Sequence, residues 1–240
     1  MNSSNIKKLG IIGGMGPLAD TVFLKALHLA TAATRDCEYV PIIYDGNCIR
    51  PDRSSFITQK DCSSPFISLK RSLRSLEKCG ADVIAIPCNT AHFWFDKLKS
   101  SASKSTVLLN MPSAACDCCD KKGLKRVGLL ATEGTYKSRI YSSRLNALGI
   151  ECIEPSPASK EMLTEVIRKI KGGEKAVFDR IENELLSQNC EAVITGCSEL
   201  SYILLNSQNE RGTIYIDPIS ALASSAVSAC GRPARHIPYC

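Results

Sequence analysis

The sequence predicts an α/β protein made of two similar lobes, each built around a mainly parallel sheet. Short apolar runs alternate with helical patterns along all 240 residues, and the alternation restarts at about residue 126. Three segments also recur in the same order: LGIIGG (9–14) and VGLLAT (127–132), CGADVIAIPCNT (79–90) and QNCEAVITGCSE (188–199), VLLNMPSAA (107–115) and IYIDPISAL (214–222). Three matches in register indicate an internal duplication, with a pseudo-twofold axis relating the lobes. Ligands bind beyond the carboxyl ends of parallel strands, so we expect the active site in the cleft between the lobes.

The first half contains the expected elements of one α/β lobe. Short apolar runs bounded by glycine, proline or polar residues predict strands at Lys8–Ile12, Tyr39–Tyr44, Ala81–Ile86 and Thr106–Leu109. Helices are expected over Leu18–Ala33, Pro65–Lys78 and Ala91–Lys99, and from about Ser113. In the second of these, Phe66, Leu69, Leu73 and Leu76 share one face, and Gly80 ends the helix. Residues 45–53 are expected to form a loop.

The second half repeats the pattern. Strands are predicted at Arg126–Ala131, Ile150–Ile153, Ala192–Thr195 and Thr213–Ile216. Helices are predicted from Tyr136, over about Lys160–Lys171 and Glu174–Gln188, and after Asp217-Pro218. We place the first lobe at residues 1–112 plus 224–240 and the second at 113–223.

Composition narrows the function classes. No apolar run is long enough to cross a bilayer and no signal-peptide pattern opens the chain, so we expect a cytoplasmic protein that does not bind membranes. The net charge is +6, but the basic residues are scattered and not interleaved with aromatic ones, which argues against nucleic-acid binding. A basic site that attracts an acidic metabolite fits better. The 13 cysteines form no disulfide framework, and most should be reduced thiols packed as small apolar groups.

Two of the cysteines occupy equivalent positions in the two halves. Cys88 and Cys197 each follow a buried strand, in turns shaped by Pro87 and Gly196. At the start of the next helix, amide dipoles would lower the pKa of such a thiol. One thiol on each wall of a cleft suits the inversion of a stereocentre, because a proton can leave one face of a carbon and return to the other.

Other patterns leave alternatives open. Gly14-Met15-Gly16-Pro17-Leu18-Ala19 fits the G-x-G-x-x-A fingerprint of dinucleotide sites, and Asp45 could bind a ribose, so an NAD-dependent oxidoreductase is one alternative. That interpretation leaves the cysteine pair unexplained. A non-catalytic protein that binds acidic amino acids is the other alternative. His92, four residues after Cys88, could tune the thiol or serve packing. The cluster Cys116, Cys118 and Cys119 lacks the spacing of a metal site, and we expect no metal.

The motifs also resemble a known family. GGMGP (13–17), PCNTAH (87–92), GLLATEGT (128–135) and GCSE (196–199) are similar to motifs of the aspartate/glutamate racemase family, in particular the cofactor-independent aspartate racemases. The similarity extends from about Lys8 to Asp217-Pro218. Two positions depart from the family pattern: Ser198 stands where the family usually has threonine, and Arg50 where an apolar residue is typical.

The resemblance implies racemisation of aspartate, or of glutamate, without a cofactor. It implies that Cys88 acts on the D-isomer and Cys197 on the L-isomer, that Arg53 and Lys171 hold the substrate carboxylates, and that the protein is a homodimer. From the residues themselves we expect backbone N–H donors to a substrate carboxylate in the turn Gly14-Met15-Gly16, and matching donors at the second-half positions Thr132, Gly134 and Thr135. Side-chain contacts to the small acidic substrate are expected from Asn89, Thr90, Ser198 and Glu199, the last of which could instead be structural.

Overall fold

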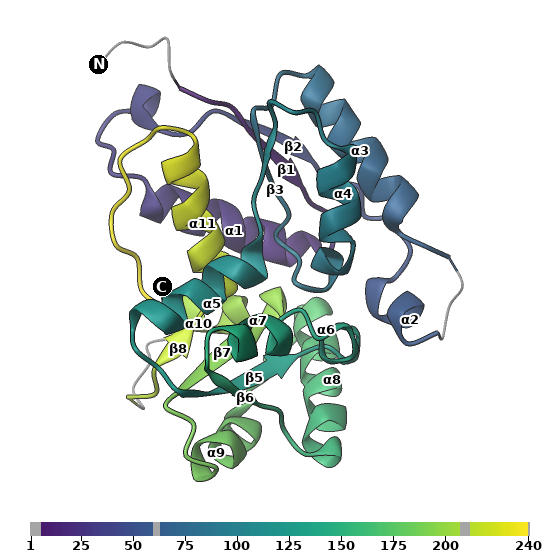
Figure 1. The fold of residues 1–240 in the computed structure, drawn as a ribbon, viewed down its shortest axis with the longest axis vertical. Helices are drawn as coiled ribbons and strands as arrows, with labels where there is room; N and C mark the ends of the chain where they lie inside the picture. Colours follow the sequence, from purple (N-terminus) through teal and green to yellow (C-terminus); the bar gives the residue numbers. More distant parts are fainter. Residues whose placement is uncertain (1–5, 60–62, 207–211, 240) are drawn as a thin grey trace.

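The computed structural model, which describes residues 6–59, 63–206 and 212–239, contains two four-stranded parallel sheets. The first has the order β2-β1-β3-β4 and the second the order β6-β5-β7-β8, so corresponding strands occupy corresponding places. The strands are β1 (Leu9–Ile12), β2 (Ile42–Asp45), β3 (Val83–Ala85), β4 (Val107–Leu108), β5 (Arg126–Ala131), β6 (Glu151–Ile153), β7 (Ala192–Gly196) and β8 (Tyr215–Ile216). The predicted two-lobed α/β fold is confirmed (Figure 1).

Helices cover both faces of each sheet. They are α1 (Pro17–Ala30), α2 (Arg53–Ile57), α3 (Phe66–Lys78), α4 (Phe95–Ser101), α5 (Met111–Lys121), α6 (Glu133–Ser138), α7 (Ser142–Ala147), α8 (Pro157–Lys171), α9 (Asp179–Ser187), α10 (Ser198–Asn206) and α11 (Pro218–Ala229). In α3 the predicted apolar face, with Leu69, Leu73 and Leu76, is buried against the first sheet. Gly80 ends this helix with a φ of 84°, a left-handed conformation that glycine adopts easily.

Helices α5 and α11 lie between the two sheets at equivalent positions of the two halves (Figure 1). Each of them packs against the sheet of the other half. Each begins with a capping side chain and an early proline: Asn110 accepts the Ser113 N–H and Asp217 accepts the Ser220 N–H, both at 3.0 Å. Helix α5 ends the first half but packs into the core of the second sheet. Helix α11 ends the second half but packs against α1 and the first sheet. The lobe boundaries given above stay a prediction.

The loop expected at residues 45–53 is present, and it leads into the short helix α2, which was not expected. The Asp52 carboxylate caps this helix by accepting the Ser55 N–H at 2.7 Å. Two other local expectations were wrong. The helix expected over Ala91–Lys99 is a 3₁₀ turn (Thr90–Trp94) followed by α4. The helix expected from Glu174 begins at Asp179, because the chain turns at Gly173 and places Phe178 in the core first.

No helix in the described ranges combines the length and apolar character that crossing a membrane requires.

Candidate active site

A cavity lies between the lobes, at the carboxyl ends of β3, β5 and β7. It is lined by Met15, Asp52, Arg53, Ser54, Cys88, Asn89, Thr90, Thr132, Lys171, Cys197, Ser198 and Glu199. Both cysteines of the predicted pair line it, one from each lobe, and both side chains are buried. Most of the site residues expected from the sequence are therefore brought together around one small space. Asp52 and Ser54, which were not expected there, come from α2 and the turn before it.

Three expected residues do not line this cavity: Gly16, Gly134 and Thr135. Gly134 has another role, because a Cβ there would lie 2.7 Å from Ser54 Cα and 2.8 Å from its hydroxyl oxygen. Residue 134 must therefore lack a side chain for α2 of the first lobe to rest on α6 of the second. The expected function of Gly134 as a backbone donor to a substrate carboxylate stays a prediction.

In the glycine turn after β1, the Gly14 amide is hydrogen-bonded to a side chain of the protein itself. The Gly14 N–H donates to Asp20 Oδ2 at 2.6 Å, and the Tyr44 hydroxyl donates to the same oxygen at 2.8 Å. Burial raises the pKa of Asp20. The expectation that the Gly14 amide faces a substrate carboxylate is therefore wrong, since the first turn of α1 supplies a carboxylate of its own. Met15 does line the cavity, and its carbonyl oxygen accepts from Arg53 Nη2 at 3.3 Å.

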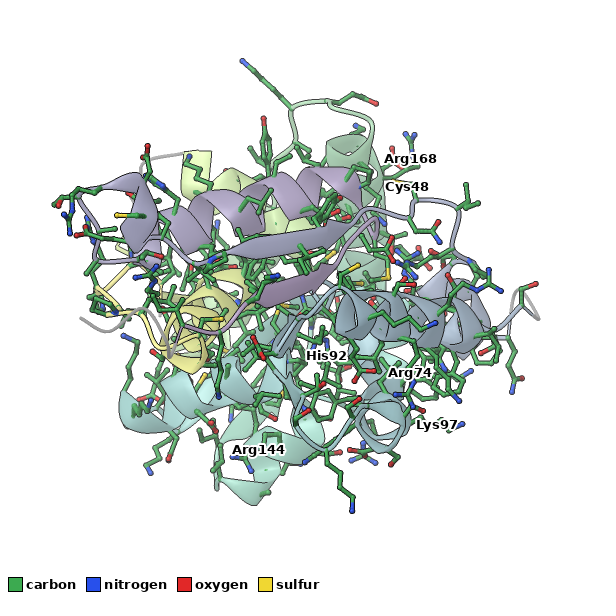
Figure 2. The ribbon with its side chains drawn as sticks, turned by 90° about the horizontal axis from the view of Figure 1, so that it is seen from above. Cys48, Arg74, His92, Lys97, Arg144 and Arg168 are labelled. Carbon is green, nitrogen blue, oxygen red and sulfur yellow. The ribbon has the colours of Figure 1, made fainter. Side chains whose placement is uncertain are left out.

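His92 holds the backbone next to Cys88. Its Nδ1 lies 2.9 Å from the Cys88 carbonyl oxygen, and its Nε2 accepts the Met111 N–H at 3.1 Å. The ring therefore carries its proton on Nδ1. Burial lowers the pKa of His92 to about 4. Figure 2 shows this residue in the interior, with Arg74, Lys97 and Arg144 toward the outside. Of the two roles considered for His92, the structure shows backbone support of the Cys88 turn.

Cys197 is paired with a buried carboxylate. Its thiol donates to Glu199 Oε2 at 3.0 Å, and Glu199 Oε1 lies 3.6 Å from Lys171 Nζ. Burial raises the pKa of Cys197 well above its usual value, the Glu199 charge adds to this, and Lys171 opposes it. The expectation that the start of the next helix lowers the pKa of this thiol is wrong, because burial and a neighbouring carboxylate outweigh the amide dipoles.

Two cations, Arg53 and Lys171, line the cavity together with the carboxylates of Asp52 and Glu199. Burial acts to lower the pKa of Lys171, but the charges of Glu199 and Cys197 outweigh it and raise the pKa. The charge of Arg53, which also lines the cavity, opposes this increase. Lys171 stays protonated at neutral pH and can attract a second, substrate carboxylate beside Glu199.

Three threonine hydroxyls join the lobes at the edge of the cavity. Thr90 of the first lobe lies 2.9 Å from Thr132 and 3.0 Å from Thr135 of the second, and Thr132 and Thr135 are also 3.0 Å apart. Three hydroxyls with three protons can satisfy one another, and any one of them can rotate to donate to an arriving anion. Thr135, which does not line the cavity, can therefore influence a bound anion through its contacts with Thr90 and Thr132.

The remaining sequence signals lie outside the cavity. Arg50 is buried, and its guanidinium contacts Asp45 at 3.4 Å and Ser72 at 2.8 Å. Asp45, considered as a ribose ligand, is therefore paired with a cation. Cys116 and Cys119 are core residues of the second lobe whose pKa values are raised by burial. Among the described residues, no group of three or more His, Cys, Asp or Glu side chains is arranged to hold a metal ion.

Comparison with known proteins agrees with this geometry. The model of the family described as Asp/Glu/hydantoin racemase matches residues 12–226. The broad-specificity amino-acid racemase RacX of Bacillus subtilis is 27% identical over 233 residues, which cover 92% of this chain and 96% of that protein. The structure of Picrophilus torridus aspartate racemase superposes with a TM-score of 0.82 at 27% identity, covering 95% of this chain and 96% of that one.

A more distant structure shows the same fold. Glutamate racemase from Francisella tularensis, solved with D-glutamate, has a TM-score of 0.65 at 19% identity and covers 94% of this chain and 81% of that one. The resemblance carried by the four sequence motifs is thus confirmed. The chain belongs to the Asp/Glu/hydantoin racemase family and is an isomerase of the amino-acid racemase type.

Proposed function

We propose that the protein interconverts L- and D-aspartate, or the closely similar glutamate, by proton transfer between two cysteines and the substrate Cα, without a cofactor. One observation carries the proposal: Cys88 and Cys197, at equivalent points of the two lobes, line the same cavity. In one direction the thiolate of one cysteine takes the α-proton and becomes a thiol, while the thiol of the other gives its proton to the opposite face of Cα and becomes a thiolate.

The contacts around Cys197 support a starting state for this cycle. Because its thiol donates to Glu199, Cys197 holds a proton in the free protein. Cys88 is then the base in the first turnover, and the enantiomer whose α-hydrogen faces Cys88 binds this state. The family resemblance assigns that enantiomer as the D-isomer. Glu199 acts by keeping the proton of Cys197 in place, and Ser198, buried beside it, is available to the substrate.

The two cations that line the cavity support an acidic substrate. Removal of the α-proton adds negative charge to the α-carboxylate, and preorganised donors in a water-poor site stabilise that charge. Asn89, Thr90 and Thr132 supply such donors, and Arg53 and Lys171 supply two cations for two carboxylates. The Picrophilus relative is an aspartate racemase, whereas the Bacillus relative has broad specificity, so neutral and basic amino acids belong in the assay. The homodimer and the cytoplasmic location stay predictions.

The test is incubation of the purified protein with single enantiomers in heavy water, followed by chiral chromatography and mass measurement. We expect L- and D-aspartate to interconvert with uptake of one deuterium at Cα. Cys88→Ala and Cys197→Ala should each abolish racemisation, while Cys190→Ala, at the opposite end of β7, should retain it. Racemisation at the parent rate by both single variants would refute the two-cysteine mechanism. Binding of aspartate without deuterium uptake would instead identify a non-catalytic binding protein.

A further inference from the structure

The two ends of the Asn89 side chain have different environments. Its Oδ1 accepts a hydrogen bond from the Tyr141 hydroxyl. Its Nδ2 is buried and has no hydrogen-bond partner among the residues that the structure describes. Asn89 is 2% exposed and lines the reaction cavity. A buried donor without an acceptor destabilises the folded protein, so its presence here points to an acceptor that arrives with a ligand.

Tyr141 fixes which end of the amide is left unpaired. It precedes α7 in the second lobe, is 1% exposed, and packs into the core of that lobe. Burial raises the pKa of its hydroxyl well above 10, so the group remains a donor. If the Asn89 amide were flipped, Nδ2 could donate to the phenol oxygen of Tyr141. The phenol proton would then lack an acceptor, because Asn89 is the partner found for this hydroxyl in the described part of the chain.

We propose that Tyr141 is a positioning residue: its hydroxyl holds the Asn89 amide so that Nδ2 donates to the α-carboxylate of the bound amino acid. This inference rests on the proposed function. The α-carboxylate is chosen over the side-chain carboxylate because Asn89 directly follows Cys88, which by the proposed function takes the proton from Cα. Charge grows on the α-carboxylate as the proton leaves, so a correctly oriented amide stabilises the transition state more than the ground state. Tyr141 belongs to one lobe and Asn89 to the other, so the contact between the two lobes orients the donor.

The test is a double-mutant cycle on racemisation. Tyr141→Phe keeps the ring and removes the hydroxyl, and we expect kcat/KM to fall about tenfold, as for one lost hydrogen bond, with most of the loss in kcat. Asn89→Ala should lower it further, and the double variant should match Asn89→Ala alone, because Tyr141 acts through Asn89. Tyr136→Phe is the matched control: this buried hydroxyl bonds to the backbone of Leu129 and Ala131, and its loss should leave kcat/KM unchanged. Additive effects of the Tyr141 and Asn89 changes would overturn the proposal.

A second measurement separates this inference from the proposed function. With ¹⁵N-labelled asparagine, the side-chain amide signals of Asn89 are identified by their loss in Asn89→Ala. In the ligand-free protein, Tyr141→Phe should shift these signals and broaden them as the amide begins to rotate. If the wild-type protein racemises none of the acids tested, the proposed function fails, and this spectrum still decides the positioning role. Asn89 signals that are the same with and without the Tyr141 hydroxyl would refute it.

Discussion

The buried His92 predicts a specific loss of stability in mild acid. Its pKa is about 4 in the folded protein and 6.5 in an unfolded chain. Between these values the unfolded chain binds a proton that the folded protein does not, so the free energy of unfolding falls as the pH falls from 6.5 toward 4. The full difference corresponds to about 3 kcal/mol, of which about 2 kcal/mol is lost between pH 7.5 and 5. Above pH 6.5 this contribution is complete.

The physical reason is the pair of backbone bonds that the neutral ring makes. A proton on Nε2 removes the acceptor for the Met111 N–H and places a charge on a buried ring. Other buried groups act in the opposite sense: Asp20 and Asp217 have raised pKa values, so their contributions to stability decrease as the pH rises. The wild-type curve alone therefore mixes several effects, and a variant is needed to isolate the histidine.

The assay is urea unfolding of the wild type and His92→Gln at pH 7.5, 6, 5 and 4. We expect His92→Gln to be less stable than the wild type at pH 7.5, and the difference to shrink by about 2 kcal/mol at pH 5, because glutamine has no proton to gain. The same change at His28, whose exposed ring stacks on Tyr39, is the control and should keep the wild-type pH dependence. Parallel curves for the wild type and His92→Gln would refute the reasoning.

Three further predictions concern the site and its supports. Gly134→Ala should push α2 away from α6, since the new Cβ would lie 2.7 Å from Ser54 Cα. We expect a higher KM and, in urea unfolding, a stability loss of about 1–3 kcal/mol. An unchanged KM would contradict the packing argument. Asp217→Ala removes the acceptor for Thr195, Ser201 and Ser220 and should cost about 3–5 kcal/mol by the same assay; a loss below 1 kcal/mol would count against it. Glu199→Gln removes a charge that raises the pKa of Cys197, so alkylation of Cys197, followed by peptide mass, should occur at lower pH than in the wild type; the opposite shift would contradict the assigned electrostatics.

How far the sequence leads depends on the range of the interaction concerned. Strand and helix positions follow from apolar periodicity, which acts within a few residues, and α3 with its end at Gly80 was predicted on that basis. The short helix α2 was missed, although its signal, Asp52 three residues before Ser55, is local and was visible as a cap. The prediction that a helix begins at Glu174 was wrong, because Phe178 is buried in the core and the helix begins after it, at Asp179. Burial of Phe178 is a tertiary contact.

The site residues also divide into those with a signal in the sequence and those that depend on tertiary contacts. The duplicated turns at Cys88 and Cys197 could be found from the sequence, because internal repeats preserve the order of residues, and parallel strands bring their carboxyl ends to one edge. Asp20 gave no interpretable signal, since an acidic residue in the first turn of a helix is common, and only the folded chain shows that it occupies the Gly14 amide. Tyr141 likewise lies 52 residues from its partner Asn89.

By itself the sequence determined the two-lobed α/β architecture, the family and the pair of cysteines, because these depend on local patterns and on a repeat that can be read along the chain. Only the tertiary structure decided the state of the groups: the raised pKa of Cys197, the occupied Gly14 amide and the unpaired end of Asn89. Burial and the charge or hydrogen bond of a neighbour set these properties, and both arise only when residues distant in the chain are packed against one another.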